Sequence, residues 1–201
     1  CQPRANLINN DLCKVMQELK VKIVNFGFES GSERMLHWLK GESVTVEMNK
    51  NAIVLCKKYG FTVYGSLIFA SPGEKIKDME ETLKFIDFAV AHNIDYLWSF
   101  IGTPFPDTPF WNIALEREKV SKDMDFSLLS HHNLDNPLLL DEDVDKKRFK
   151  EIFILGRKKL RKLKIKLMFN FFKHYPVATI KLFAKSPGYY ASRVIKQVYK
   201  H

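Results

Sequence analysis

Helical spacing and continuous apolar runs alternate along the first 118 residues of the chain. A first helix is indicated by apolar residues three and four positions apart, at Leu12, Val15, Met16 and Leu19. Its expected N-cap is Asn10 or Asp11, and an apolar, β-branched run over residues 21–28 follows it as a strand. The same order of helix and strand then recurs, so the pattern predicts a repeating unit.

The next two units carry their own boundary signals. Thr45 is the expected N-cap of a second helix, Gly60 lies just past its end, and residues 61–70 form the next strand. A third helix is marked by Ile76, Met79, Leu83, Ile86 and Val90. Residues 94–101 follow it as a strand, and a helix over residues 109–118 completes the series.

Strands that alternate with helices imply parallel strands joined by right-handed crossovers. Strands buried on both faces read as continuous apolar runs, so these runs predict a sheet that is covered on both sides. The expected fold class of residues 1–118 is therefore α/β, as part of a (β/α) barrel.

The rest of the chain has a different pattern. Residues 119–145 lose the periodicity and are predicted to form a covering loop, whereas residues 146–201 are predicted to form a basic helical tail. A long helix is marked by apolar residues at helical spacing, Phe149, Ile152, Leu160, Leu163, Leu167 and Phe171. Pro176 and Pro187 are expected to divide the remainder into shorter helices.

The net charge of +9 conceals an asymmetry along the chain. Residues 146–201 contain 17 Lys and Arg against the single acid Glu151, while residues 1–145 contain 15 bases and 22 acids. A polybasic tail is drawn to anionic lipid, nucleic acid or an acidic protein surface. The alternative is a basic helix that is simply solvated.

Cysteine content and hydropathy bear on the compartment. The chain has three cysteines, Cys1, Cys13 and Cys56, which fit neither an even disulfide framework nor a close metal-ligand spacing. They indicate reduced thiols in a cytoplasmic protein. The sequence has no apolar stretch of membrane-spanning length and does not begin like a signal peptide, which points the same way.

Polar and turn residues gather where the three apolar runs end, in residues 25–32 (NFGFESGS), 70–74 (ASPGE) and 103–109 (TPFPDTP). The carboxyl ends of parallel strands meet at one face of a β/α barrel, and that face carries the functional site. The three stretches are therefore expected to form one ligand-binding site.

These stretches resemble segments of radical SAM enzymes. Residues 26–32, followed by Leu36, Lys40 and Thr45, resemble the family's fourth-strand segment. Residues 66–74 resemble the fifth strand and its turn, and residues 103–109 resemble the turn after the sixth strand. The sequence is most similar to the family members that have an upstream cobalamin-binding domain, including the magnesium-protoporphyrin ester cyclase type. The similarity covers about residues 1–118 and implies a partial barrel of the radical SAM type.

Three departures from the family pattern stand out. Ala70 and Asp107 stand where the family usually has Gly. The family's cluster motif, C-x3-C-x2-C, is absent, and the three cysteines of this chain do not have that spacing. We expect residues 1–4 to be the end of the third strand, the [4Fe–4S] ligands to lie in an upstream part of the same protein, and this chain to be inactive alone.

The resemblance implies that the residues at the strand ends bind S-adenosylmethionine. The Glu29 carboxylate can accept two hydrogen bonds from the paired ribose hydroxyls, with help from Ser30 and Ser66. Lys40 and Arg4 are candidates for pairing with the methionine carboxylate. The adenine is expected near Ile68 and near the backbone of the turn at Pro72 and Gly73. No catalytic residue and no metal ligand is assigned.

Several of these residues have simpler interpretations. Glu29 can instead cap the following helix, Lys40 can be a surface base, and Ser66 can be an ordinary strand serine. His131 and His132 are interpreted as loop residues, because no third ligand lies nearby in the sequence. A group of aromatic residues can line a substrate cavity or fill the core, namely Trp98, Phe100, Phe105, Phe110 and Trp111.

The sequence thus predicts part of a radical SAM enzyme that methylates or functionalises a C–H bond of a small-molecule or lipid-like substrate, with cobalamin as a further possible cofactor. One alternative is a methylthiotransferase whose basic tail contacts RNA. Another is an interfacial anchor in residues 146–201 that places the protein at an anionic membrane surface. The last is a binding module without catalytic activity.

Overall fold

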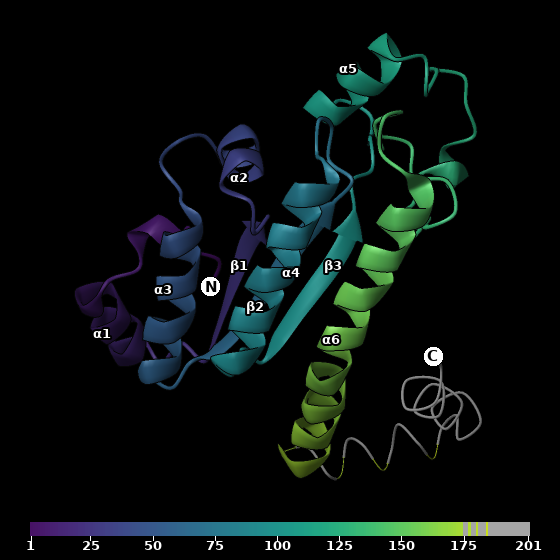
Figure 1. Cartoon of the computed structure of the whole chain (residues 1–201). Helices are drawn as coiled ribbons and strands as arrows, with labels where there is room; N and C mark the ends of the chain where they lie inside the picture. The colour runs from purple at the N-terminus through teal and green to yellow at the C-terminus, as the bar shows by residue number, and fades with distance from the viewer. Residues whose placement is uncertain (175–176, 178–179, 181–183, 185–201) are drawn as a thin grey trace.

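The structure is a computed structural model that describes residues 1–174, 177, 180 and 184, with side chains for residues 1–163, 177, 180 and 184. Strands β1 (Ile23–Glu29), β2 (Thr62–Phe69) and β3 (Tyr96–Ile101) form a parallel sheet in that order. Helices separate the strands along the chain (Figure 1). The predicted α/β class and partial barrel are confirmed.

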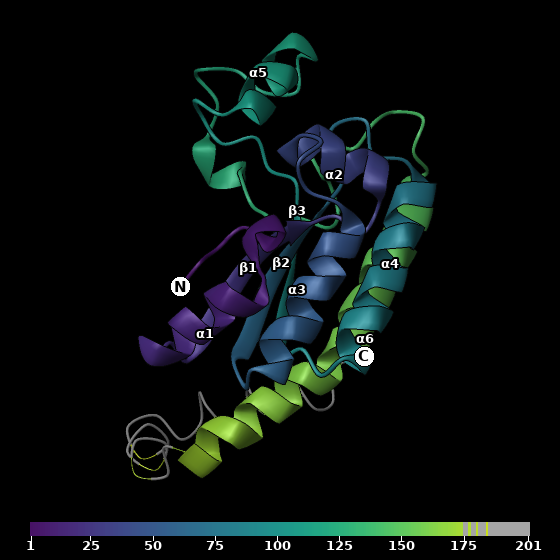
Figure 2. The same cartoon turned by 90° about the vertical axis from the view of Figure 1, so that its left-hand side faces the viewer.

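The helices of the repeating units are α1 (Asn10–Glu18), α2 (Glu33–Lys40), α3 (Val46–Lys58), α4 (Ile76–Ala91) and α5 (Pro109–Glu116). Short 3₁₀ turns occur at η1 (Ala5–Leu7) and η2 (Phe126–Leu128), and the long helix α6 covers Lys146–His174. Helices α3, α4 and α6 lie on one side of the sheet (Figures 1 and 2).

The two faces of the sheet differ in burial. Beneath the helices the core is built from strand residues that include Val24, Phe26, Phe28, Leu67, Phe69 and Ile101. The opposite face, here called the open face, carries half-buried side chains at alternate positions: Asn25, Glu29, Tyr64, Ser66, Ile68, Tyr96, Trp98 and Phe100. The expectation of strands fully buried on both faces is therefore wrong for this chain.

The helix N-caps show which of the predicted helix starts are correct. Thr45 is the N-cap of α3, and its hydroxyl accepts a hydrogen bond from the Met48 N–H at 3.1 Å, as predicted. The N-cap of α1 is Asn9, whose side chain accepts from the Leu12 N–H at 2.9 Å. The predicted caps Asn10 and Asp11 lie inside the first turn, because several neighbouring polar residues can serve as caps.

Helix α2 is an element that the hydrophobic pattern did not reveal. It spans only two turns, and its buried apolar residues are Met35 and Leu36. So short a helix gives too few repeats for a periodic signal.

The segment before α1 lies beside β1. The amino group of Cys1 donates to the Ile23 carbonyl at 2.9 Å, and the Asn25 N–H donates to the Cys1 carbonyl at 2.9 Å. This is the hydrogen-bond pattern of a parallel neighbour, and it fits the expected strand end at residues 1–4.

Helix α6 packs along α4 and β3. Phe149, Ile152, Phe153 and Leu160 are buried, and the ring of Phe153 meets Phe69 of β2 edge-on at 5.4 Å. The predicted helical positions Leu167 and Phe171 lie outside the described side chains, and the breaks predicted at Pro176 and Pro187 lie outside the described residues. In the described part of the chain, no helix has both the length and the apolar content needed to cross a bilayer.

We expect Phe153→Ala to lower the free energy of unfolding by about 3–5 kcal/mol, because it leaves a cavity between α6 and β2. The neighbouring variant Ile154→Ala is the matched control, since that side chain is 51% exposed. Urea titrations of both variants measure the difference. Equal destabilisation would contradict this packing.

Candidate functional site

The polar part of the open face lies at the end of β1, where the strand changes its course. Pairing with β2 shifts register between Gly27 and Glu29, and Glu29 adopts a left-handed backbone with φ of 62°. The carboxylate folds back over Gly27, where a Cβ would lie 2.2 Å from Glu29 Oε1. The Gly-x-Glu pattern therefore has a steric basis, because glycine leaves room for the carboxylate.

Lys40, the last residue of α2, reaches the same place. Its Nζ donates to the Gly27 carbonyl at 2.6 Å and lies 3.7 Å from Glu29 Oε1. Both side chains are about one-fifth exposed, at 19% for Lys40 and 22% for Glu29. Burial raises the pKa of Glu29, and the charge of Lys40 opposes that rise. The structure thus brings two predicted site residues into one half-buried ion pair.

The alternative roles of these two residues do not describe this geometry. The N-cap of α2 is Ser32, so Glu29 does not cap the helix. Lys40 is more than a surface base, because its ammonium group is held against the backbone of β1.

The loop after β1 is anchored to α4 by two serines and a glycine. Ser30 is fully buried and its hydroxyl lies 3.2 Å from Thr82 Oγ1, which also accepts a hydrogen bond from the Gly31 N–H at 3.0 Å. Ser32 Oγ donates to Asp78 Oδ1 at 2.6 Å. A Cβ on Gly31 would lie 2.6 Å from the Cβ of Phe85, so glycine is required for this approach. The Ser30 hydroxyl is engaged inside the protein.

Arg34 and Asp78 strengthen this anchor. The two side chains form an ion pair, and Arg34 also donates to the Gly73 carbonyl at 2.8 Å. Burial alone would raise the pKa of Asp78, but hydrogen bonds from Arg34, Ser32 and the Lys75 N–H hold it below its usual value. Asp78 therefore stays ionised and links α2, the β1 loop and the start of α4.

The turn after β2 is also closed by internal contacts. Gly73 has φ of 76°, and its N–H donates to Asp141 of the 119–145 segment at 2.7 Å. Its carbonyl is bound by Arg34, so both backbone groups of Gly73 already have partners. Pro72 is buried beside it. Ile68, the other residue predicted near the adenine, lies on the open face.

The two departures from the expected glycines have a common conformation. Ala70 has φ of 59° and Asp107 has φ of 63°, both in the left-handed region where glycine is least strained. The chain keeps the backbone turn at both positions with a side chain present.

Glu74 is a buried carboxylic acid in the same turn as Ala70. One carboxylate oxygen accepts from the Ser71 N–H at 3.2 Å, while Oε1 and the Ser71 hydroxyl are buried without a hydrogen-bond partner among the described residues. Burial raises the pKa of Glu74 to about 8, against hydrogen bonds from Ser71 and Ala70 that lower it. The side chain is therefore protonated near neutral pH.

The remaining predicted residues are placed as follows. Ser66 is half-buried on the open face, opposite Gly27 in the β1–β2 register. Arg4 is exposed, and its guanidinium group donates to the Ser43 hydroxyl at 3.4 Å. Asn25, on the open face two residues before Gly27, lies in the predicted stretch 25–32 but was given no role of its own. Its Oδ1 is buried and unpartnered among the described residues, a signal that only the structure reveals.

The β3 side of the open face is aromatic. Tyr64, Tyr96 and Trp98 meet edge-on, with ring centroids 4.5–6.4 Å apart. Beyond them a pocket of about 310 Å³ opens at the end of β3, lined in part by Phe100, Phe105 and Phe110. Trp111 instead lies in a separate buried cluster with Ala114, which is the core alternative for this residue.

The chain is similar to several known proteins. Residues 2–86 match the model of the Radical SAM superfamily. An uncharacterized methyltransferase of Pyrococcus horikoshii is 36% identical over 112 residues, which is 56% of this chain and 24% of that protein. A tRNA-2-methylthio-N(6)-dimethylallyladenosine synthase of Pseudomonas savastanoi pv. phaseolicola is 28% identical over 112 residues, 55% of this chain and 25% of that protein.

Among solved structures, the radical S-adenosylmethionine methyltransferase TsrM of Kitasatospora setae, with tryptophan substrate and a SAM analog bound, superposes with a TM-score of 0.53. The match covers 81% of this chain and 35% of that chain at 17% identity, and it supports the fold. The chain spans about a quarter of the length of the curated relatives it matches. Together these matches show that the first part of the chain is similar to radical SAM proteins.

The family implies S-adenosylmethionine and a [4Fe–4S] cluster, and the residues present fit the two differently. The open face offers a carboxylate, an ammonium group and the orphaned Asn25 oxygen to a polar ligand. The cysteines do not fit a cluster, because Cys13 and Cys56 are buried and burial raises the pKa of the Cys56 thiol to about 12.

We expect the stability of the protein to fall as the pH rises from about 5 to 8. In this window the folded state keeps the Glu74 proton, while the unfolded chain, with an ordinary value near 4.5, has lost it. Glu74→Gln mimics the protonated form and should remove that part of the pH dependence, on the order of a few kcal/mol. Urea titrations at pH 5, 6.5 and 8 measure it; parallel pH profiles for both proteins would contradict the buried-acid assignment.

Proposed function

We propose that this chain forms part of the barrel of a radical SAM enzyme and that the end of β1 binds S-adenosylmethionine. The observation that supports the proposal is the Glu29–Lys40 ion pair, half-buried over Gly27 at the carboxyl end of a parallel sheet. Such strand ends are where ligands bind in α/β folds.

The chemical roles follow from the charges. The Glu29 carboxylate accepts hydrogen bonds from the paired ribose hydroxyls. Ser66, which is also on the open face, lies opposite Gly27 in the β1–β2 register. The Lys40 ammonium group attracts the methionine carboxylate. Ile68 offers an apolar surface to the adenine. Ser30 acts as a positioning residue, since its contact with Thr82 fixes the loop that follows Glu29.

S-adenosylmethionine, held by Glu29 and Lys40, would supply radical hydrogen abstraction once a reduced iron–sulfur cluster gives it one electron. The cluster ligands would come from an upstream part of the same protein, and this chain alone would be inactive. Its own residues would orient the cofactor on the open face.

We favour methylation or C–H functionalisation as the outcome, because the Pyrococcus horikoshii relative is described as a methyltransferase. The cobalamin-dependent subgroup, with cobalamin as a second cofactor, is the specific form that we propose. An RNA methylthiotransferase is the second candidate, favoured by the identity to the tRNA-2-methylthio-N(6)-dimethylallyladenosine synthase. The remaining candidate is a binding module without catalytic activity, for which no radical chemistry is expected.

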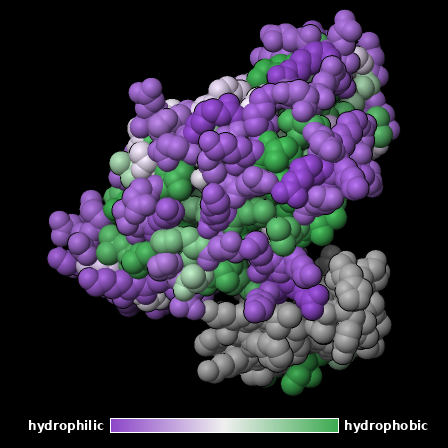
Figure 3. All heavy atoms as spheres, in the orientation of Figure 1, coloured by the Kyte–Doolittle hydropathy of each residue, from purple (hydrophilic) through white to green (hydrophobic). Residues whose placement is uncertain are grey.

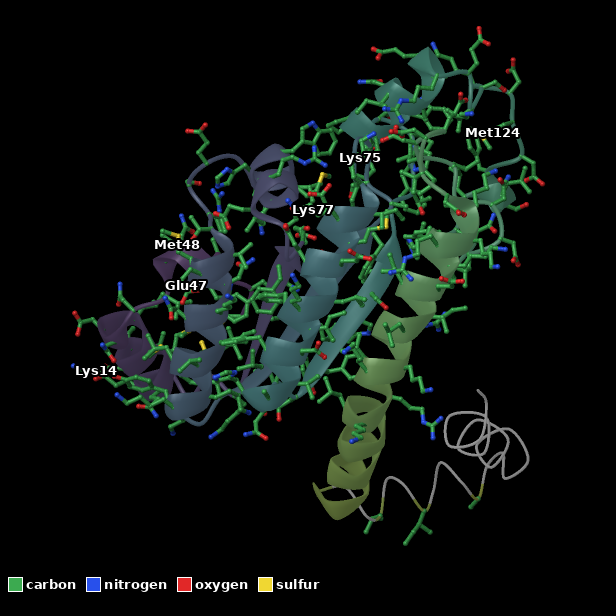
Figure 4. All side chains as sticks on the ribbon, viewed as in Figure 1. Lys14, Glu47, Met48, Lys75, Lys77 and Met124 are labelled. Carbon is green, nitrogen blue, oxygen red and sulfur yellow. The ribbon has the colours of Figure 1, made fainter. Side chains whose placement is uncertain are left out.

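We predict that Glu29→Ala weakens S-adenosylmethionine binding by the complete protein by about 10- to 100-fold, since hydrogen bonds to a charged group contribute about 1.5–3 kcal/mol. Glu29→Gln should lose less, because the amide keeps one acceptor. Calorimetry measures the affinities. Glu47→Ala, on the exposed side of α3 (Figure 4), is the control. Unchanged affinity in a folded Glu29→Ala protein would contradict the assignment.

We also propose that α6 binds an anionic membrane surface, with a lipid-like substrate as the corresponding substrate class. Ile154 and Leu155 are 51% and 44% exposed, beside the basic residues Lys158, Arg161 and Lys162. Apolar residues reach the surface among hydrophilic ones on this side of the molecule (Figure 3). Apolar side chains flanked by bases fit the headgroup region of anionic lipids. From the sequence, the residues expected to face the lipid are Leu160, Leu163, Leu167, Met168, Phe171 and Phe172. Leu160 and Leu163 are instead buried, at 2% and 5% exposure, so this part of the expectation is wrong. The side chains of the other four lie outside the described ones.

The chain should co-sediment with vesicles of 70% phosphatidylcholine and 30% phosphatidylglycerol at low salt, and should not do so with pure phosphatidylcholine. The double variant Lys158→Glu and Lys162→Glu should reduce binding at least tenfold. The same charge change at the exposed residues Lys20 and Lys22 is the control and should have a smaller effect. Equal loss in both variants would mean a general charge effect and would overturn the α6 assignment.

A further inference from the structure

The two backbone carbonyls before Glu29 are each bound by a side chain from a helix that follows β1. Lys40 of α2 donates to the Gly27 carbonyl at 2.6 Å. Asn49 of α3 donates from Nδ2 to the Phe28 carbonyl at 3.1 Å. The end of β1 is therefore held by two helices at consecutive peptide groups, and Glu29 is the next residue.

The Phe28 carbonyl also closes a tight turn around Glu29. The Ser30 N–H donates to it at 2.8 Å, which makes Glu29 the central residue of a three-residue turn, and the φ of Glu29 is 62°. A γ-turn with a positive φ at its centre is rare and strained. Such a conformation persists only where the surrounding structure holds it. The backbone of Glu29 therefore depends on contacts from outside the turn.

Asn49 is a buried amide whose presence stability does not explain. Its exposed fraction is 0%, and its Oδ1 has no hydrogen-bond partner among the described residues. A buried polar atom without a partner lowers the stability of a protein. An apolar side chain of similar size would avoid that cost. The feature that distinguishes Asn49 from such a side chain is the bond that it donates to Phe28.

The start of α3 gives the Asn49 amide a fixed position. The backbone N–H of Asn49 donates to the carbonyl of the N-cap Thr45 at 3.1 Å. The Val46 N–H donates to the side chain of Glu33, the first residue of α2, at 2.9 Å. The first turns of α2 and α3 are thus joined, and Asn49 meets the end of β1 from a well-anchored helix start.

We propose that Asn49 is a positioning residue that directs the Glu29 carboxylate through the Phe28 carbonyl. While this carbonyl is held from α3, β1 turns at Glu29 and the carboxylate folds over Gly27 toward Lys40. Without the bond, the turn relaxes toward the negative φ that non-glycine residues favour, and the carboxylate leaves Lys40. The consequence for S-adenosylmethionine rests on the proposed function, whereas the effect on Glu29 does not.

The first experiment follows the backbone of Glu29 by NMR in the chain without ligand. A positive φ brings the amide proton of a residue close to its own Hα, which gives a strong nuclear Overhauser effect between them. The effect should be strong for Glu29 in the unmodified chain and clearly weaker in Asn49→Leu, which removes the donor at similar side-chain volume. Asn51→Leu, the same change at an exposed position of α3, is the matched control and should leave the effect unchanged.

A double-mutant cycle then tests whether Asn49 acts through Glu29. In the complete protein, Asn49→Leu should weaken S-adenosylmethionine binding about three- to tenfold, as expected for the loss of one uncharged hydrogen bond. Added to Glu29→Ala, the same change should cause little further loss, because the side chain that Asn49 directs is already gone. A purely structural residue would weaken binding by the same factor in both backgrounds.

Urea titrations separate positioning from stability. Asn49→Leu removes one hydrogen bond but also the unpartnered Oδ1, so the free energy of unfolding should change little. Should Asn49→Leu fail to fold, Asn49→Ala removes the same donor with a shorter side chain, and both readouts apply to it. A large loss of stability with an unchanged Glu29 signal would mean a structural role alone.

Two results would overturn the inference: an unchanged Glu29 signal in the folded variant, or equal losses of affinity with and without Glu29→Ala. The NMR measurement uses neither S-adenosylmethionine nor turnover. If Glu29→Ala itself leaves the affinity unchanged while Asn49→Leu alters the Glu29 signal, the cofactor assignment fails and the positioning of Glu29 by Asn49 stands. The two failures are therefore distinguishable.

Discussion

The close approach of Gly31 to α4 is the contact on which the site depends. A side chain at that position would overlap the backbone of Thr82 and the Cβ of Phe85, so the loop after β1 can lie against α4 only because it carries glycine. Hydrogen bonds from Ser30, Gly31 and Ser32 to Thr82 and Asp78 then fix the loop. With the loop held, the end of β1 and the start of α2 are both determined. Glu29 and Lys40 meet as a consequence.

The open face combines two chemical environments. Charged and polar groups lie along β1, and aromatic rings lie along β3. Between them β2 contributes Ser66 and Ile68, one polar and one apolar residue in adjacent positions on the face. Because parallel strands end at the same edge, both environments are within reach of one another without any rearrangement of the sheet.

Much of the architecture was predictable, because it rests on local patterns. The strands were visible as apolar runs, and Thr45 and Gly60 marked the ends of α3. Such signals depend on residues only a few positions apart. The pairing of Glu29 with Lys40 could have been predicted too, since the sequence marks both residues, although as separate ligands of the cofactor.

The details of the site were not predictable, because they depend on residues distant in sequence. Ser30 and Thr82 are 52 positions apart, and Gly73 and Asp141 are 68 positions apart. No local pattern reports that the hydroxyl of Ser30 is directed into α4, or that the turn at Gly73 is covered by the 119–145 segment. The buried, protonated state of Glu74 has the same origin, since it follows from the surrounding packing.

The Glu29–Lys40 ion pair has a consequence for the energetics of ligand binding. In the free protein each charge already has a partner, so neither is left half-buried and uncompensated. A zwitterionic ligand that engages both residues must separate them and replace each contact with one of its own. The net gain is then the difference between two sets of charge contacts. Discrimination would accordingly rest on the geometry of the ligand, and its total charge would matter little.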